Sequence, residues 1–185
     1  MNAEIDISGI VLKTARLILR PWRQEDLDDF YEYARVDGVG QMAGWLPHEG
    51  KETTQMILDS FITHKKTFAL ELNGKVIGSL GIETYNEEKF PELANLQGRS
   101  IGYVLSKEYW GKGLMPEAVK AVQKYLFDTV GLDFLLISHF VWNGQSRRVI
   151  QKCGFQYLKN DVHETRYGTR EDVLEYVLWK KDWKA

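Results

Sequence analysis

The chain has 185 residues, of which 44% are apolar and 27% charged, so it has the size and composition of one globular domain rather than of a disordered segment. Its formal net charge is −2 and no dense block of Lys and Arg occurs, which argues against a nucleic-acid-binding protein. The single cysteine, Cys153, excludes an internal disulfide, and the four histidines lack zinc-ligand spacing, so we expect no metal site.

The N-terminus lacks the apolar core of a signal peptide, and no uncharged apolar run approaches the roughly 18 residues that a membrane span requires. We therefore expect a cytoplasmic protein without membrane contacts. No repeat, low-complexity tract or linker interrupts the sequence, so we expect a single domain over residues 1–185.

The first part of the chain predicts a strand followed by two helices. Residues 14–22, TARLILRPW, alternate apolar and polar side chains, as in a strand. Residues 23–36 have helical spacing at Leu27, Phe30, Tyr31 and Ala34. A second helix is predicted over residues 51–65, with one side formed by Met56, Ile57, Ser60 and Phe61.

The middle of the chain is rich in strand patterns. Residues 67–85 contain two such runs separated by Asn73-Gly74, which is the strongest short-range signal for a hairpin. Residues 98–106 predict a third strand. Its Gly102 lies within the run, where glycine often marks a bulge or the close approach of another group.

A long helix and a buried strand follow. The helix has one apolar face and is expected to end at Gly131; the face is formed by Met115, Ala118, Val119, Val122 and Leu126. Residues 133–142 are almost continuously apolar, which is typical of a central strand. Residues 143–155 predict a short helix, and two strands around a polar loop complete the chain.

The stretch SKEYWGKGLMPEA, residues 106–118, places Gly111 and Gly113 between a strand and a helix. Unpaired backbone N–H groups and the helix dipole favour an anion there, and glycine lets a phosphate come close to the amides. The dinucleotide fingerprint is excluded because Pro116 replaces its third glycine, and the P-loop pattern is also absent. A turn that needs glycine for steric reasons alone is the alternative.

Five segments together carry a resemblance to a known family. They are TARLILRPW, VIGSLGI, IGYVLSKEYWGKGLMPEA, NGQSRRVIQKCGF and YVLWKKDW, and they occur in the family's order over residues 12–183. The chain resembles the GCN5-related N-acetyltransferases (GNAT), in particular the branch similar to the RimJ/RimL ribosomal-protein acetyltransferases. The resemblance implies an α/β fold with a mixed, mostly antiparallel sheet flanked by helices and a splayed strand pair at the acetyl-CoA site.

The resemblance also implies a two-part site for acetyl-CoA. The pyrophosphate would lie on the amides of the turn, which are those of Trp110, Gly111, Lys112, Gly113, Leu114 and Met115. The pantetheine would pair like an added strand with the backbone of Tyr103, Val104 and Leu105, which would explain Gly102.

Three side chains near the turn have more than one interpretation. Lys112 is a candidate phosphate partner or a solvated lysine, and Trp110 is more a packing anchor than a ligand contact. Glu108 stands where the family usually has Gln or Arg. A carboxylate there would lower the affinity for the cofactor unless it faces away.

Asn143 and Ser146 are the candidates next to the reacting thioester. Both have the ordinary interpretation of helix-capping residues. The resemblance implies that Asn143 contacts the pantetheine and that the Ser146 hydroxyl protonates the departing thiolate. The tyrosine that many members use for this purpose is replaced by Ile150, so the proton would come from Ser146, from a water or from no group at all. Cys153 is expected to be a buried apolar residue rather than a nucleophile. The resemblance implies that the acetyl group passes directly to the acceptor, without an acyl-enzyme.

The acceptor amine must lose a proton before it attacks, and Glu83 is the candidate base, with a solvated strand-end glutamate as the alternative. Trp45, His48 and Tyr167 are expected to line the acceptor cleft. The predicted activity is acetyl transfer to a primary amine, including a protein N-terminal amine or a small molecule. The alternative is a non-catalytic acyl-CoA-binding or regulatory module. An exposed edge strand would allow a homodimer.

Overall fold

The computed structural model describes residues 1–184. Its strands are β1 (Leu12–Lys13), β2 (Ile18–Pro21), β3 (Thr67–Leu72), β4 (Lys75–Glu83), β5 (Gly98–Leu105), β6 (Phe134–Phe140), β7 (Gln156–Glu164) and β8 (Arg170–Trp179). Its α-helices are α1 (Leu27–Ala34), α2 (Lys51–His64), α3 (Leu114–Lys124) and α4 (Gly144–Lys152). Among the helices of residues 1–184, none has both the length and the apolar character needed to cross a membrane.

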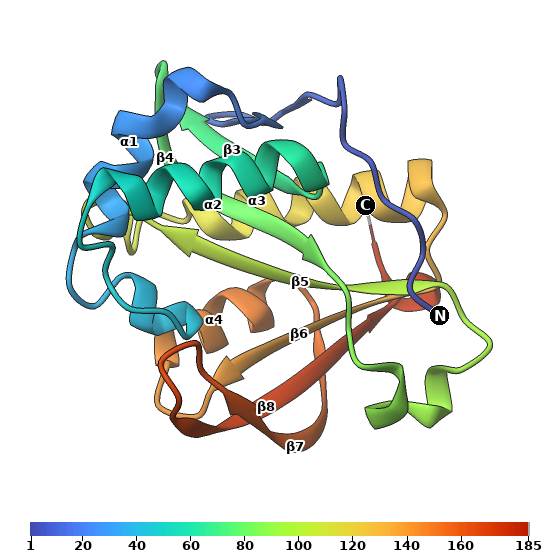
Figure 1. Ribbon diagram of the computed structural model, residues 1–185. Coiled ribbons are helices and arrows are strands. Elements are labelled where there is room, and N and C mark those ends of the chain that lie inside the picture. Colours follow the sequence, from blue (N-terminus) through green and yellow to red (C-terminus); the bar gives the residue numbers. More distant parts are fainter. Residues whose placement is uncertain (185) are drawn as a thin grey trace.

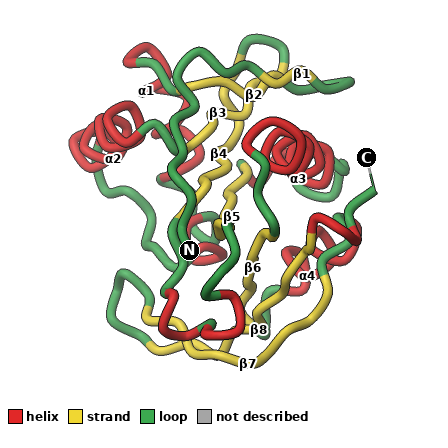
Figure 2. Tube along the Cα trace, turned by 90° about the vertical axis from the view of Figure 1, so that its right-hand side faces the viewer, coloured by secondary structure: helices red, strands yellow, loops and turns green. Residues whose placement is uncertain are grey.

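The eight strands form one sheet in the order β1-β2-β3-β4-β5-β6-β8-β7 (Figure 1). The neighbouring strands pair antiparallel except β5 and β6, which pair in parallel. Helices α1 and α2 cover one face, and α3 and α4 cover the other (Figure 2). This is the mixed, mostly antiparallel sheet flanked by helices that the family resemblance implies.

Strands β5 and β6 pair over only three residues. The pairs are Gly98 with Phe134, Arg99 with Leu135 and Ser100 with Leu136. Both strands continue well beyond the last pair, and Figure 1 shows them diverging towards their C-terminal ends. The sheet therefore contains a gap between the second half of β5 and the second half of β6, which is the expected splay.

Two local predictions are confirmed by the backbone. Asn73 and Gly74 have φ angles of 51° and 82°, as a tight type I′ hairpin turn requires, and they join β3 to β4. The predicted apolar face of α3 is buried: Ala118, Val119 and Val122 are fully inaccessible. The helix runs into a π-helical segment, Tyr125–Val130, and ends at Gly131 with φ 85°.

The predicted buried side of α2 is wrong in part. Met56 is 67% exposed, whereas Thr54 and Leu58 are fully buried. The Thr54 hydroxyl lies 2.8 Å from Nδ1 of the buried His48, so a polar side chain occupies the core side of the helix. The predicted Ile57 and Phe61 do pack against the core. The buried side is shifted towards Thr54 and Leu58, because one buried contact of the helix is a hydrogen bond that hydrophobic spacing does not reveal.

Candidate active site

The gap between β5 and β6 opens into a cavity of about 1280 Å³. Side chains from both faces of the sheet line it. Tyr103 and Ile137 reach it from the face that α3 and α4 cover, and Val104 and Ser138 from the opposite face. The cavity thus connects the start of α3 with the side of the sheet that α1 and α2 cover.

The turn before α3 presents unpaired backbone N–H groups at one end of this cavity. Among residues 1–184, no acceptor receives a hydrogen bond from the amides of residues 111 to 115, and residue 116 is a proline. Gly111 and Gly113 line the cavity together with the first residues of the helix. Five consecutive free amides at a helix start form a site for an anion.

Both glycines of the turn adopt left-handed conformations, with φ of 74° at Gly111 and 73° at Gly113. A Cβ atom at Gly111 would meet no other atom within 4 Å, and one at Gly113 would meet only Arg16, at 3.6 Å. Within the chain itself, glycine is therefore needed for its backbone conformation rather than for space. The open space in front of the turn remains available to a ligand.

Two side chains hold this turn in place. Arg16 donates from Nη1 to the carbonyl oxygen of Lys112 at 2.9 Å and from Nε to the Glu117 carboxylate at 2.7 Å. Trp110 donates from its indole N–H to the carbonyl oxygen of Leu105 at 2.8 Å, which ties the turn to the end of β5. Trp110 thus acts as a packing anchor. Its backbone amide donates to the Lys107 carbonyl oxygen at 3.2 Å, so the expectation that this amide is free for a pyrophosphate is wrong. Arg16 was not among the predicted site residues.

Asn143 caps α4. Its side-chain oxygen accepts a hydrogen bond from the Ser146 amide at 3.1 Å, and its side-chain nitrogen donates to the carbonyl oxygen of Met42 at 3.3 Å. Asn143 is 4% exposed and lies at the cavity wall. The capping interpretation is thus observed, and the same side chain also holds the 40–43 turn against the mouth of the gap.

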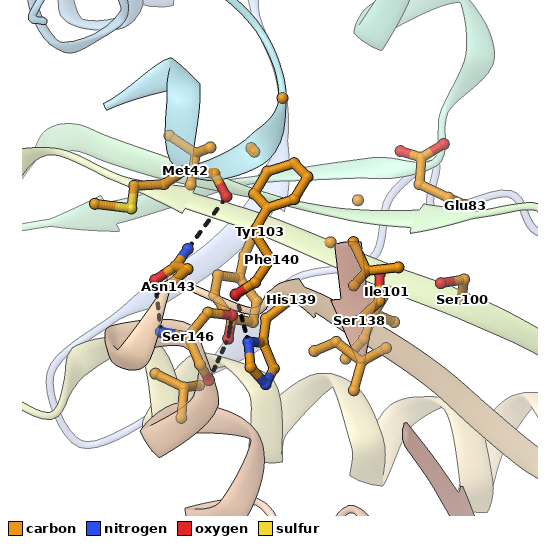
Figure 3. A pocket seen from close by; sticks show the side chains of 18 of the residues that line it. Met42, Glu83, Ser100, Ile101, Tyr103, Ser138, His139, Phe140, Asn143 and Ser146 are labelled. Carbon is orange, nitrogen blue, oxygen red and sulfur yellow. Dashed lines mark hydrogen bonds between the residues drawn. The ribbon is translucent and has the colours of Figure 1, made fainter. Parts of the chain in front are cut away.

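The Ser146 hydroxyl faces β5. Its Oγ lies 2.8 Å from the hydroxyl oxygen of Tyr103, so the two side chains share a hydrogen bond across the cavity (Figure 3). Burial raises the pKa of Tyr103 well above its usual range, and the bond to Ser146 only partly opposes this shift. Tyr103 therefore remains a neutral phenol that can donate a hydrogen bond to the Ser146 hydroxyl or accept one from it.

Glu83 lies on the other side of β5 from Ser146 (Figure 3). It ends β4 and lines the cavity, and its side chain is exposed. Its carboxylate folds back over Gly81, where any Cβ atom would collide with it. Gly81 pairs with Gly102 on β5, so two neighbouring residues without side chains leave the floor of the cavity bare beside Glu83.

Two of the expected acceptor-side residues meet at the cavity. The rings of Trp45 and His48 lie 5.0 Å apart, and both residues line the cavity. Burial lowers the pKa of His48, and the nearby Arg166 lowers it further. Tyr167 does not line the cavity, although its neighbour Arg166 does.

Two residues of the turn region also lie outside the cavity lining. The Lys112 ammonium group stands over the Tyr109 ring, 5.2 Å from its centre. Glu108 is exposed and does not line the cavity, which favours the interpretation that its carboxylate faces away from a ligand at the free amides.

Sequence reasoning missed a second carboxylate, Glu175 on β8, and its neighbour Ser138 on β6. A signal for Glu175 is present in the chain. Along β8, Val173 and Val177 are buried on one face, and Glu175 stands between them on that face. A charged residue within an apolar row is the pattern that marks a functional candidate.

The chemistry that this arrangement supports is a transfer between two bound molecules. The amides of residues 111 to 115 suit a phosphate-bearing donor, hydroxyl groups lie at the gap, and carboxylates lie on the opposite face. Cys153 does not fit the role of nucleophile: it is 5% exposed and burial raises the pKa of its thiol to about 12. Among residues 1–184, no group of three His, Cys, Asp or Glu could hold a metal ion.

Comparisons with known proteins agree with this picture. A family profile described as an acetyltransferase (GNAT) domain matches residues 16–156. The chain is 27% identical over 182 residues to the "Uncharacterized N-acetyltransferase p20" of Bacillus licheniformis, which covers 93% of this chain and 97% of the relative.

Solved structures have a similar fold. An acetyltransferase of the GNAT family from Bacillus anthracis has a TM-score of 0.80 at 21% identity and covers 93% of this chain and 99% of its own. The RimJ protein of Mycobacterium smegmatis in complex with CoA-disulfide has a TM-score of 0.73 at 20% identity, over 95% of this chain and 90% of its own.

Proposed function

The chain belongs to the GNAT acetyltransferase family and is an acyltransferase, and from this premise we propose that it moves an acetyl group from acetyl-CoA directly to a primary amine. The observation that carries the proposal is the row of five free amides next to the gap between β5 and β6. A phosphate-bearing donor bound at these amides can extend into the gap, where its reactive end lies among the hydroxyl and carboxylate groups.

The residues of the turn fit acetyl-CoA. The amides of residues 111 to 115 would hold the pyrophosphate, with Trp110 and Arg16 keeping the turn in shape. The half of β5 without a β6 partner, which contains Tyr103, Val104 and Leu105, would pair with the pantetheine. The Leu105 carbonyl oxygen already accepts a hydrogen bond from the Trp110 indole. The pantetheine would therefore pair with the remaining backbone N–H and C=O groups of this half of β5.

Direct transfer requires a proton for the departing thiolate. Ser146 is proposed as the donor, and its support is its place at the gap and its hydrogen bond to the neutral Tyr103. Cys153 is buried and its thiol has a raised pKa, which supports attack by the amine itself without an acyl-enzyme.

The acceptor side is the face that carries Glu83. A carboxylate there can bind an ammonium group and take its proton, and Glu83 is proposed for this role. Trp45 and His48 would line the path of the acceptor. A protein N-terminal amine is one acceptor to test, because RimJ is among the structures of similar fold.

The test is acetyl-CoA turnover across a panel of small primary amines and N-terminal peptides, followed by release of free thiol. We expect thiol release that depends on the amine and saturates with it. Binding of acetyl-CoA without release for any amine would support the alternative, a non-catalytic acyl-CoA-binding module.

A further inference from the structure

A second carboxylate reaches the cavity from the opposite side of the gap. Glu175 on β8 is the direct cross-strand neighbour of Ser138 on β6, and both residues line the cavity. The last pair between β5 and β6 joins Ser100 to Leu136, so Ser138 lies two residues beyond it, at the edge of the gap. Glu175 is therefore one strand away from the gap on the β6 side. On the β5 side, Gly81 of β4 is also one strand away, and the Glu83 carboxylate is folded over it.

Glu175 lies between two buried valines on β8, and no side chain of the described residues pairs with its carboxylate. Its neighbours on the same face of β8, Val173 and Val177, are each 3% exposed. Within residues 1–184 its carboxylate makes no hydrogen bond and no ion pair, although it lines a cavity that a ligand can enter. Burial raises the pKa of Glu175 to about 7, which suits a base that works near neutral pH.

The charged groups around Glu175 do not neutralise it. Asp161 on β7 raises its pKa further, while Lys159, the direct cross-strand neighbour of Glu175 on β7, and Lys89 before β5 lower it. The Lys89 ammonium group is 2.7 Å from the Asp161 carboxylate, and Lys159 donates to the Lys89 carbonyl and lies over the Phe90 ring. Ser138, which faces Glu175 from β6, carries no charge. An incoming cation would be the first direct partner of this carboxylate.

We infer that Glu175 is a further catalytic residue of the proposed transfer: the ammonium group of the acceptor hydrogen-bonds to its carboxylate and gives it one proton. The neutral nitrogen then forms a bond to the thioester carbon, and the carbon–sulfur bond breaks. The second proton passes from the nitrogen to Glu83, which also lines the cavity. The thiolate takes a proton from Ser146, which regains one from water, and the two carboxylates release their protons to solvent. This inference rests on the proposed function, and it names cationic primary amines as the substrate class.

The experiment uses the full chain and an amine that the panel identifies as an acceptor. kcat/KM is measured from pH 5.5 to 9 for the wild type, Glu175→Gln, Glu83→Gln and Asp172→Asn. Asp172 is the matched control because it is exposed on the same strand and does not line the cavity. Acetyl-CoA affinity and circular dichroism are recorded for each variant to separate catalysis from folding.

We expect the wild-type rate to rise with pH through about 7, since the carboxylate must be ionised to accept a proton. Glu175→Gln should lose this rise and about 100-fold or more in kcat/KM, while its acetyl-CoA affinity stays within twofold. Asp172→Asn should match the wild type. A folded Glu175→Gln variant that retains the wild-type rate and pH profile would overturn the inference alone. An inactive wild type would instead overturn the proposed function and the inference with it.

Discussion

Tyr103 and Ser146 are 43 residues apart in the sequence, yet their hydroxyl oxygens lie 2.8 Å from each other. The pair joins β5 to the first turn of α4 across the cavity at the gap. If Tyr103 donates, the Ser146 proton is free to point towards the sulfur of the donor. The hydrogen bond then orients the group that is proposed to act on the leaving thiolate.

Removing these hydroxyls should affect turnover more than affinity. Ser146→Ala should lower kcat by about 10-fold or more and leave acetyl-CoA affinity within twofold, because the proton is needed in the transition state. Tyr103→Phe should lower kcat by about 2- to 12-fold, the value of one ordinary hydrogen bond. The double variant should resemble Ser146→Ala, since Tyr103 acts through Ser146. Steady-state kinetics check this, and additive losses would argue for separate roles.

Substitutions at Gly113 can affect both the stability of the fold and the affinity for acetyl-CoA, and the left-handed conformation of this residue allows the two effects to be separated. At φ 73°, Gly113→Val should destabilise the fold by about 1–2 kcal/mol, whereas Asn tolerates this region. Gly113→Asn should therefore remain stable and still weaken acetyl-CoA binding by about 10-fold or more, through loss of one or two amide–phosphate bonds. The matched control is Gly131→Asn, at φ 85° on the far end of the helix. Calorimetric titration that finds wild-type affinity for Gly113→Asn would contradict the anion site.

Glu175 should make the stability of the protein depend on pH. Its pKa is raised from 4.5 to about 7 on folding, so the folded state holds its proton over a range where the unfolded state has lost it. The free energy of unfolding should fall as the pH rises from about 4.5 to 7. Glu175→Gln lacks this loss and should be more stable than the wild type at pH 8, on the order of 1–3 kcal/mol, but not at pH 4.5. Urea unfolding at the two pH values measures the difference; equal stability at pH 8 would show that Glu175 is well solvated.

Asn143 should matter for stability as well as for the site. Asn143→Ala removes the cap of α4 and the hydrogen bond to the Met42 carbonyl, and we expect a loss of about 1–2 kcal/mol. Asn143→Asp keeps the capping oxygen and should recover most of this loss. Denaturant unfolding compares the two variants, and equal losses would mean that the contact with Met42 outweighs the cap.

Local chemistry made several features predictable from the sequence. The Asn73-Gly74 hairpin, the apolar face of α3 and the turn at Gly111 and Gly113 each depend on a few consecutive residues, so their patterns are readable without the fold. The family resemblance added the splayed strands and the position of Asn143 and Ser146.

Features that depend on distant residues were not predictable in the same way. Thr54 is buried because His48 accepts or donates a hydrogen bond there, which no periodicity reveals. The place of Glu175 follows from the register of β8 against β6, and the place of Arg16 from its contacts with the turn about 100 residues later. Tyr167 was expected at the cleft because it is aromatic and in a loop, but loop direction is set by tertiary contacts.

The gap between β5 and β6 has a consequence for the order of events. The gap is an opening through the sheet. The free amides lie on the face that α3 covers, whereas Glu83 and Glu175 lie on the opposite face. Donor and acceptor can therefore be held at the same time without competing for one entrance. Initial-rate plots should then intersect, as for a ternary complex, and not run parallel as in a ping-pong scheme. A single molecule that joins CoA to an amine through a short acyl linker would pass through the gap and occupy both sides. It should therefore inhibit in competition with acetyl-CoA and with the amine.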